Sequence, residues 1–380
     1  MSADAPPAGG LNILHVLRAP VGGLFRHVLD LVCGQCARGN RIGLVADAST
    51  GGTQAEENFA QLAPHLALGL TRVSMSRQFG LRDLGARAHV ARRAIEAGAD
   101  IVAGHGAKGG AYARLLTSPR AARVYTPHGG SLHYSWRSPA GAFYLASERL
   151  LLGRTDLFLF ESAYGRQAFE TKISKPRGLA QVVHNGVRPE EFAPIAADTG
   201  ASDLVFVGEL RSLKGVDVLI EAVAILYRAG KRISVTIVGE GPERAAFEAL
   251  AAAHGVTASV RFAGAKPART AFALGHLLVV PSRAESLPYV VLEGAAAGIP
   301  MIATRVGGIA EIFAADSDSL VPAGDPQALA AAITQALLHP AAARVMAQRL
   351  QTRVRAHFIV EVMTRAVLAA YLEALARRDS

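Results

Sequence analysis

The sequence predicts an α/β protein with two domains, each built on a doubly wound parallel sheet. Short apolar segments alternate with helical patterns along the whole chain, an order that is typical of parallel sheets. The length of 380 residues exceeds one ordinary core and suits two domains. Between the two runs, residues 188–202 (RPEEFAPIAADTGAS) carry prolines, acids and small residues without periodicity, as linkers do.

These patterns set the expected domain boundaries. The expected order is a disordered lead-in over 1–10, a first domain over 11–190, a linker over 191–202, a second domain over 203–356 and a C-terminal helix over 357–380. The lead-in, MSADAPPAGG, has neither a basic segment nor an apolar core, so it does not resemble a signal peptide, and we expect the protein in the cytoplasm.

The first domain begins with the strand Leu11–Leu17, followed by Gly22, Gly23 and a helical pattern from Leu24. The two glycines would let a ligand approach the N-terminus of that helix, although they also suit a plain tight turn. Further strands are expected at 42–46, 70–75, 101–105, 123–127, 157–160 and 181–183.

The second domain repeats this alternation. Strands are expected at 204–207, 234–238, 260–262, 277–280, 301–304 and 319–321, with helices between them and from Pro326 onwards. Gly208 and Gly264 each follow a strand, where parallel sheets place their ligand-binding loops.

The most informative stretch is His276–Phe313, which predicts a strand, a loop, a helix and a second strand. Ser286 and Pro288 are typical of a helix start, with Ser286 as the cap. Glu285 lies in the loop and Glu293 in the helix. The loop therefore combines a carboxylate, free backbone N–H groups and a helix N-terminus, which suits a ligand with both phosphate and hydroxyl groups.

The spacing Glu285-x7-Glu293, in the context PSRAES-P---LEG--AG-P, resembles the retaining family-four glycosyltransferases of the GT-B type. The segments TPHGG at 126–130 and HNGV at 184–187 also resemble motifs of that family's first domain. The resemblance implies two Rossmann-like domains that face each other across a cleft, with the acceptor bound by the first domain and the donor by the second. It also implies that the C-terminal helix returns to the first domain.

The resemblance implies roles for individual residues of the predicted donor site. Glu285 would hold the donor sugar and Glu293 the ribose hydroxyls. The segment Ser286, Leu287 and Pro288 would bind the diphosphate, and the Gly22–Gly23 loop would lie over the diphosphate and the acceptor.

Three further residues are candidates for catalysis. His128 follows a strand, where it could position the sugar, although a lone histidine is often only a surface group. Arg211 and Lys214 could neutralise a leaving diphosphate, or could be solvated residues of a turn. The family commonly places its arginine directly after the glycine, and here Glu209 takes that position.

Other motifs predict neither a metal nor a redox cofactor. Cys33 and Cys36 form a C-x-x-C, but no second Cys/His pair stands at a matching spacing, so we expect a structural role. Gly239-x-Gly241 lacks the third glycine of a nicotinamide-binding fingerprint, and the chain has no P-loop. Asp316 and Asp318 form an Asp-x-Asp in a polar turn, which predicts a loop.

Composition and charge restrict the kinds of partner that the chain is expected to bind. The chain is 51% hydrophobic and 19% charged, and no apolar run approaches the roughly 20 residues of a spanning helix. Residues 1–190 hold 22 Lys and Arg against 13 Asp and Glu, whereas residues 191–380 hold 18 of each. This excess without interleaved aromatics favours anionic small molecules or an anionic membrane surface over nucleic acid, or reflects composition alone.

The resemblance implies transfer of a hexose or similar sugar from a nucleotide-sugar donor, with retention of anomeric configuration, and we expect this transfer to need no metal. We expect a UDP-sugar rather than a GDP-sugar, and a glycan or lipid-linked acceptor in cell-surface polysaccharide synthesis. A sugar-nucleotide epimerase or hydrolase, or an inactive sugar-nucleotide-binding module, would use the same fold.

Overall fold

The computed structural model describes residues 10–76, 80, 82–117 and 120–379. The chain divides into two compact units. The first unit comprises Met1–Gly186 and Val360–Ser380, and the second comprises Val187–Ile359. Apart from Gly10, the expected lead-in lies outside the described residues.

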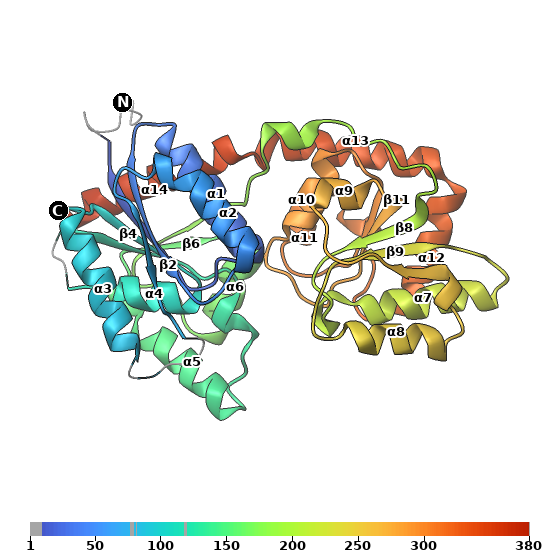
Figure 1. Ribbon diagram of the computed structural model, residues 1–380, viewed down its shortest axis with the longest axis horizontal. Coiled ribbons are helices and arrows are strands. Elements are labelled where there is room, and N and C mark those ends of the chain that lie inside the picture. The colour runs from blue at the N-terminus through green and yellow to red at the C-terminus, as the bar shows by residue number, and fades with distance from the viewer. Residues whose placement is uncertain (1–9, 77–79, 81, 118–119, 380) are drawn as a thin grey trace. The chain divides into compact units, whose positions relative to one another are not determined.

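The first unit is built on a seven-stranded, all-parallel sheet in the order β3-β2-β1-β4-β5-β6-β7 (Figure 1). Its strands are β1 (Asn12–Leu17), β2 (Arg41–Asp47), β3 (Leu70–Val73), β4 (Ile101–His105), β5 (Ala122–Thr126), β6 (Leu157–Phe160) and β7 (Leu179–Val182). Ile13 of β1 pairs with Ile42 on one side and Ile101 on the other. The strand order reverses between β1 and β4, and such a switch point opens a crevice at the carboxyl ends of the strands.

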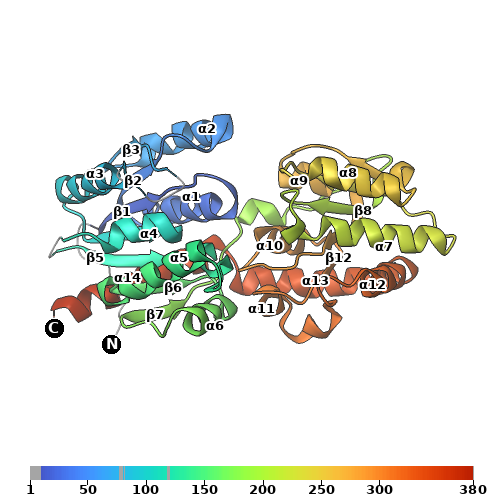
Figure 2. The same cartoon turned by 90° about the horizontal axis from the view of Figure 1, so that it is seen from below.

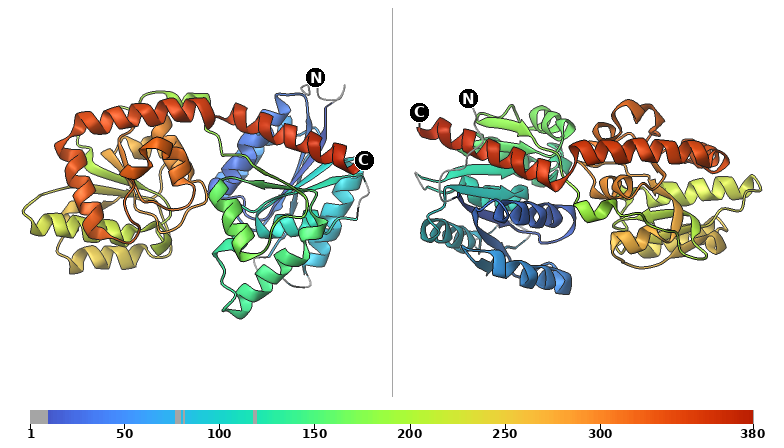
Figure 3. Two further views of the ribbon diagram at one scale, coloured as in Figure 1. Left: turned by 180° about the vertical axis from the view of Figure 1, so that it is seen from behind. Right: turned by 90° about the horizontal axis from the view of Figure 1, so that it is seen from above.

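Helices cover both faces of this sheet. They are α1 (Gly22–Cys36), α2 (Gly52–Leu62), α3 (Arg82–Glu96), α4 (Gly106–Arg114), α5 (Pro139–Leu150), α6 (Ala163–Lys172) and α14 (Val360–Asp379), with short 3₁₀ turns η1 (Ala63–His65), η2 (Gly130–His133) and η3 (Leu152–Arg154). The C-terminal helix α14 packs beside α1 (Figure 3). Their approach is close, because a Cβ on Gly34 would overlap Thr364.

The second unit has a five-stranded parallel sheet in the order β10-β9-β8-β11-β12. Its strands are β8 (Ser202–Val207), β9 (Val235–Val238), β10 (Val260–Phe262), β11 (Gly275–Val280) and β12 (Met301–Ala303). Its helices are α7 (Val216–Arg228), α8 (Arg244–Ala253), α9 (Ala268–Phe272), α10 (Tyr289–Ala296), α11 (Ile309–Phe313), α12 (Pro326–Leu338) and α13 (Pro340–His357), with η4 (Pro189–Phe192), η5 (Ser212–Lys214), η6 (Thr257–Ser259) and η7 (Ala314–Ser319).

Alternate residues of the second sheet feed two separate cores. Leu204 and Phe206 of β8 pack with α7, α8 and α12, whereas Val205 packs on the other face with α9, α10, α11 and α13. Helices α10 and α13 lie against each other on that face (Figure 2). Both faces of a parallel sheet are therefore buried, as continuous apolar strands such as LLVV require.

The predicted α/β class is confirmed, and local details differ. Helix α10 begins at Tyr289 rather than near Ser286, because Leu287 precedes Pro288 and is disfavoured in helical geometry. Gly22 and Gly23 are the first two residues of α1 rather than a turn before it.

Residues 319–321 do not form the expected strand. Ser319 ends η7, and only Val321 pairs with Thr304 in an isolated bridge. The next residue, Pro322, has no N–H with which to extend the pairing. The stretch 188–202 also contains η4 and belongs to the second unit.

Candidate active site

Two loops of the second unit meet at the switch point of its sheet. Strands β8 and β11 are neighbours, with Leu204 opposite Leu277. The loop after β8 carries Arg211 and Lys214, and the loop after β11 carries Glu285. Open parallel sheets bind their ligands at this position.

Lys214 and Glu285 form one ion pair at this point. The Lys214 Nζ lies 2.7 Å from Glu285 Oε1 and 3.0 Å from Oε2. Ser282 donates a further hydrogen bond from its Oγ to Oε1, at 2.7 Å. The carboxylate is therefore held by a cation and a hydroxyl, and its side chain is only 9% exposed. The sequence predicted a role for each residue but not this pairing.

The backbone of the Glu285 loop is confined by two glycines in left-handed geometry. Gly215 has a φ of 70°, and a Cβ there would overlap the carbonyl oxygen of Pro281. Gly307 has a φ of 56°, and a Cβ there would overlap the carbonyl oxygen of Glu285. Only glycine, which has no Cβ, allows the backbone to come so close. The two glycines therefore determine where the backbone of the Glu285 loop lies.

Side chains hold the same loop laterally. The Arg283 N–H donates to the Leu213 carbonyl at 2.8 Å, and its guanidinium binds both carboxylate oxygens of Asp217, at 2.7 and 2.6 Å. Thr304 donates from its hydroxyl to the Ser282 carbonyl at 2.6 Å. The two loops are thus tied together before any ligand binds.

The predicted diphosphate and ribose contacts belong to the same unit, whereas Gly22 and Gly23 belong to the first unit. Leu287 is buried in the core, and Pro288 occupies the N-cap position of α10. The carbonyl of Ser286 accepts a hydrogen bond from the Gly308 N–H at 2.7 Å. Glu293 is the fifth residue of α10 and is half-buried.

In the first unit, a chain of buried histidines reaches His128. His15 Nδ1 lies 2.9 Å from His105 Nε2, and His105 Nδ1 lies 3.0 Å from His128 Nε2. At the far end, His15 Nε2 lies 2.8 Å from Gln35 Oε1. His128 has a φ of 51°, an uncommon value for a residue with a side chain, and such strain often marks functional sites.

A carboxylate and an amide complete this cluster. His128 Nδ1 lies 2.7 Å from Glu161 Oε1, and His27 Nδ1 lies 2.9 Å from Asn185 Oδ1. Burial lowers the pKa of His27 and of His15 to about 4, and the pKa of His105 lies well below its usual value for the same reason.

Glu161 is the charged member of the cluster. Burial alone would raise the pKa of its carboxyl, but the adjacent His128 and the hydrogen bonds from His128 and Asn185 outweigh that effect and lower it to about 2. The Glu161 carboxyl is therefore ionised at neutral pH.

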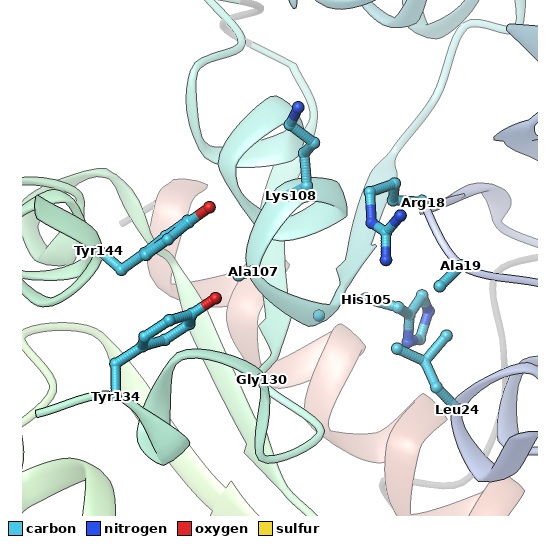
Figure 4. A pocket seen from close by; sticks show the side chains of 10 residues that line it. Arg18, Ala19, Leu24, His105, Ala107, Lys108, Gly130, Tyr134 and Tyr144 are labelled. Atoms are coloured by element: carbon cyan, nitrogen blue, oxygen red, sulfur yellow. The ribbon is translucent and has the colours of Figure 1, made fainter. Parts of the chain in front are cut away.

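A cavity of about 230 Å³ adjoins His105 at the carboxyl ends of β1, β4 and β5 (Figure 4). It is lined by Arg18, Ala19, Leu24, His105, Gly106, Ala107, Lys108, Gly130, Tyr134 and Tyr144. Tyr134 and Tyr144 stack with ring centroids 4.5 Å apart on one side, and Arg18 lies on the other. The Lys108 ammonium points away and pairs with Asp83 at 2.7 Å. The cavity thus offers aromatic faces and an arginine.

Two family models match adjoining parts of the chain. The model described as Glycosyltransferase Family 4 matches residues 21–191, and the model described as Glycosyl transferases group 1 matches residues 187–353. The chain belongs to the family-four glycosyltransferases of the GT-B type.

Curated relatives of this family-four chain match it in part. Glycogen synthase of Mycobacterium tuberculosis (strain H37Rv) is 31% identical over 274 residues, which are 70% of this chain and 65% of that protein. The lipopolysaccharide core biosynthesis glycosyltransferase LpsD of Rhizobium meliloti is 34% identical over 206 residues, or 52% of this chain and 59% of that protein. D-inositol 3-phosphate glycosyltransferase of Frankia alni is 34% identical over 42% of this chain and 44% of that protein. The chain therefore spans between 44% and 65% of the length of these relatives.

Solved structures share the fold along nearly the whole family-four chain. Sucrose-phosphate synthase of Thermosynechococcus elongatus superposes with a TM-score of 0.78 at 20% identity, covering 96% of this chain and 99% of that one. Anabaena HepE in complex with UDP and glucose gives 0.76 at 18% identity, covering 97% and 100%. These similarities establish the GT-B fold.

The family-four chain departs from the expected pattern at its arginine. Arg211 is exposed, and its Nη1 lies 3.6 Å from the Glu209 carboxylate, the residue in the position where the family commonly has arginine. An exposed pair of this kind contributes little to stability. Arg211 and Lys214 nevertheless share one loop, since the Lys214 N–H donates to the Arg211 carbonyl at 2.8 Å.

Glycines in the second unit serve loop packing. The Gly239 N–H donates to the Gly264 carbonyl at 2.9 Å, and a Cβ on Gly239 would overlap the Gly208 carbonyl. A Cβ on Gly241 would likewise overlap the Leu210 backbone. The loops after β8, β9 and β10 therefore touch through their backbones, which accounts for Gly239 and Gly241 without a nucleotide.

The C-x-x-C and Asp-x-Asp motifs lie in a helix and a 3₁₀ turn, respectively. Cys33 and Cys36 lie on α1, and neither is part of a disulfide. Asp316 pairs with Arg349 at 2.6 Å and Asp318 with Arg305 at 3.4 Å, so each carboxylate of the Asp-x-Asp binds its own arginine. Among the described residues, no helix is both long and apolar enough to span a membrane.

Most of the histidine cluster was not predicted from the sequence. His128 was a candidate site residue, whereas His15, His27, His105 and Glu161 were not, and Asn185 appeared only within the HNGV segment. The available signal was position, since His105 is the last residue of β4 and Glu161 directly follows β6. Polar residues at several carboxyl ends of one predicted sheet could have been grouped on that basis.

Proposed function

We propose that this chain transfers a sugar from a nucleotide-sugar donor to an acceptor, with retention of anomeric configuration. The observation that carries the proposal is the Lys214–Glu285 pair, held by Ser282 at the switch point of the second sheet. Family membership and the names of the relatives support glycosyl transfer.

The proposed chemistry depends on charge at the leaving group. Lys214, assisted by Arg211 and the backbone amides at the start of α10, stabilises negative charge that develops on the departing diphosphate. Glu285 contacts the sugar ring. In the ligand-free chain, Lys214 and Glu285 form an ion pair with each other. A bound donor replaces this pair, with its diphosphate beside Lys214 and its sugar beside Glu285. Removal of one such stabilising group typically slows transfer by about 100- to 1000-fold.

Nucleotide recognition is assigned to Glu293. Its carboxylate accepts hydrogen bonds from the ribose hydroxyls, each worth about 1.5–3 kcal/mol for a charged acceptor. A UDP-sugar is the favoured donor. The fold neighbour HepE of Anabaena was solved with UDP and with UDP-glucose, which supports this choice. Transfer needs no metal ion, because Lys214, Arg211 and backbone amides supply the positive charge.

The first unit is proposed to bind the acceptor. Its cavity of about 230 Å³ presents two stacked tyrosines and Arg18, which suit a sugar ring that carries an anionic group. A glycan or lipid-linked acceptor of cell-surface polysaccharide synthesis fits this chemistry. The excess of nine positive charges in residues 1–190 supports peripheral contact with anionic lipid.

The proposal is tested by donor screening coupled to a product assay. Thermal shift against UDP-, GDP-, ADP- and CMP-sugars identifies the donor, and release of the nucleoside diphosphate is then measured with and without candidate acceptors. We expect stabilisation by a UDP-sugar and release that depends on an acceptor. Equal turnover without any acceptor would instead indicate an epimerase or hydrolase, and no binding of any donor would contradict the proposal.

A further inference from the structure

Three buried histidines of the first unit converge on one point. His27 comes from α1, His105 from the end of β4 and His128 from the loop after β5, and we call them the histidine trio. One ring nitrogen of each lies within 4.8 Å of those of the other two. Each side chain is less than 5% exposed. The sequence predicted no metal, because these ligands are far apart along the chain and follow no recognisable spacing.

The tautomer of His27 follows from its amide partner. Glu161 accepts a hydrogen bond from the Asn185 side chain, so the NH₂ group of that amide faces Glu161. The amide oxygen therefore faces His27, whose Nδ1 donates to it at 2.9 Å. In the neutral ring this leaves the lone pair on His27 Nε2.

The same reasoning orients His128 and His105. His128 Nδ1 donates to Glu161 Oε1 at 2.7 Å, so Nε2 is the ring nitrogen left to bind an ion. His15 Nε2 donates to the Gln35 oxygen, so His15 Nδ1 accepts from His105 Nε2. The lone pair of His105 is then on Nδ1. An outer partner thus holds one nitrogen of each ring, and each ring has a second nitrogen with which to bind an ion.

His105 Nδ1 and His128 Nε2 lie 3.0 Å apart. Two histidine nitrogens on a tetrahedral zinc ion, at about 2.0–2.1 Å each, stand roughly 3.3 Å apart. The His105–His128 separation is close to that value, and binding draws the third ring inward. We propose that the histidine trio binds one divalent transition-metal ion, with zinc as the best match.

The surroundings of the trio match those of known metal-binding histidines. Such histidines usually donate their second ring nitrogen to a carboxylate, a carbonyl or another polar group, which fixes the ring and raises its basicity. Here Glu161, Asn185 and His15 fill those positions. The cavity beside His105 gives water access to a fourth coordination position.

This site goes beyond the proposed sugar transfer and does not rest on it. A metal bound to His128 Nε2 occupies that ring nitrogen, so His128 can no longer position the sugar through it. Metal binding is therefore expected to oppose transfer rather than to support it.

The test is metal binding by the full chain with any affinity tag removed. The protein is stripped with a chelator, dialysed and titrated with Zn²⁺ against a chromophoric competitor, and in parallel with Co²⁺. We expect one ion per chain and the intense visible bands of four-coordinate cobalt. His27→Ala should lower the zinc affinity by more than about 100-fold, a larger loss than that of an outer partner. The matched control His276→Ala, an exposed histidine in β11, should not change it.

A second variant separates metal binding from folding. Asn185→Ala keeps all three rings and removes one outer hydrogen bond, so it should lower the zinc affinity by about 10- to 100-fold while circular dichroism remains unchanged. Failure to bind zinc, or unchanged affinity in either variant, would overturn the proposal and assign the short contact to a shared proton. Cobalt–thiolate absorption would overturn it too, because the ligands would then be Cys33 and Cys36.

Discussion

Gly307→Ala tests whether the position of the Glu285 loop controls activity. In the structure, a Cβ on Gly307 would stand 1.9 Å from the Glu285 carbonyl oxygen, and side-chain contacts essentially never fall below 3.0 Å. The loop must therefore retreat by about 1 Å, and a displacement of that size in a catalytic site can cost about 100-fold in rate. The variant should fold, since the added methyl meets a surface loop rather than the core.

Gly324→Ala is the matched control. Gly324 also has a left-handed backbone, with a φ of 74°, but no atom lies within 4 Å of a Cβ built there. Both variants pay the strain of a left-handed alanine, about 1–2 kcal/mol of unfolding free energy. Only Gly307→Ala also displaces the loop.

The assay combines thermal unfolding with single-turnover sugar transfer. Both variants should lose unfolding free energy through the left-handed alanine, and Gly307→Ala should lose somewhat more because its loop is displaced. Transfer should fall about 100-fold in Gly307→Ala alone. Equal transfer rates in the two variants would refute the argument that this glycine positions Glu285.

Three further predictions concern the nucleotide, the metal and the membrane. Glu293→Gln should weaken binding of the free nucleoside diphosphate about tenfold or more in calorimetry, since it removes a charged acceptor, and unchanged affinity would place Glu293 outside the site. Transfer should survive saturating EDTA, because Lys214 and backbone amides carry the positive charge; abolition by EDTA with rescue by manganese would contradict this prediction. Binding of the full chain to anionic vesicles should fall steeply as salt rises, with neutral vesicles as the control, because surface charges are screened within about 8–10 Å. Salt-independent binding, or none, would leave the charge excess as a feature of composition.

The donor loop was predictable because its signals are local. The apolar run before Pro281, the loop with Glu285 and the glycine at the end of the helix follow one another within one strand–loop–helix–strand unit. The rule that parallel strands present their loops at one edge then placed Lys214 near Glu285. Their direct ion pair was not predictable, because no sequence pattern reports which side chains meet across two loops.

The histidine cluster shows the limit of this approach. Its members come from α1, from two strands of the sheet and from the loops that follow three others. Hydrophobic periodicity carries no information about polar residues inside such segments. His15 lies within a strand that otherwise reads as continuous core. His15, His105 and His128 form one line of hydrogen bonds only because β1, β4 and β5 are neighbours in the folded sheet.

Two secondary-structure predictions were wrong because contacts outside the local pattern decided the structure. Residues 319–321 have the composition of a strand, yet Pro322 limits the pairing to Val321. Ser286 has the side chain of a helix cap, yet its carbonyl binds the Gly308 N–H and the helix starts after Pro288. In both cases a neighbouring proline or a distant loop outweighed local propensity.

The most direct test of the donor site is a comparison of Glu285→Ala and Lys214→Ala by nucleotide calorimetry and single-turnover transfer. Glu285 is assigned to the sugar, so Glu285→Ala should leave the affinity for nucleoside diphosphate nearly unchanged or higher, since it also frees the Lys214 charge. Transfer should fall by two or more orders of magnitude, about 3 kcal/mol or more of transition-state stabilisation. Lys214→Ala should weaken both diphosphate binding and transfer. Transfer by Glu285→Ala at the wild-type rate would show that this loop is not the donor site.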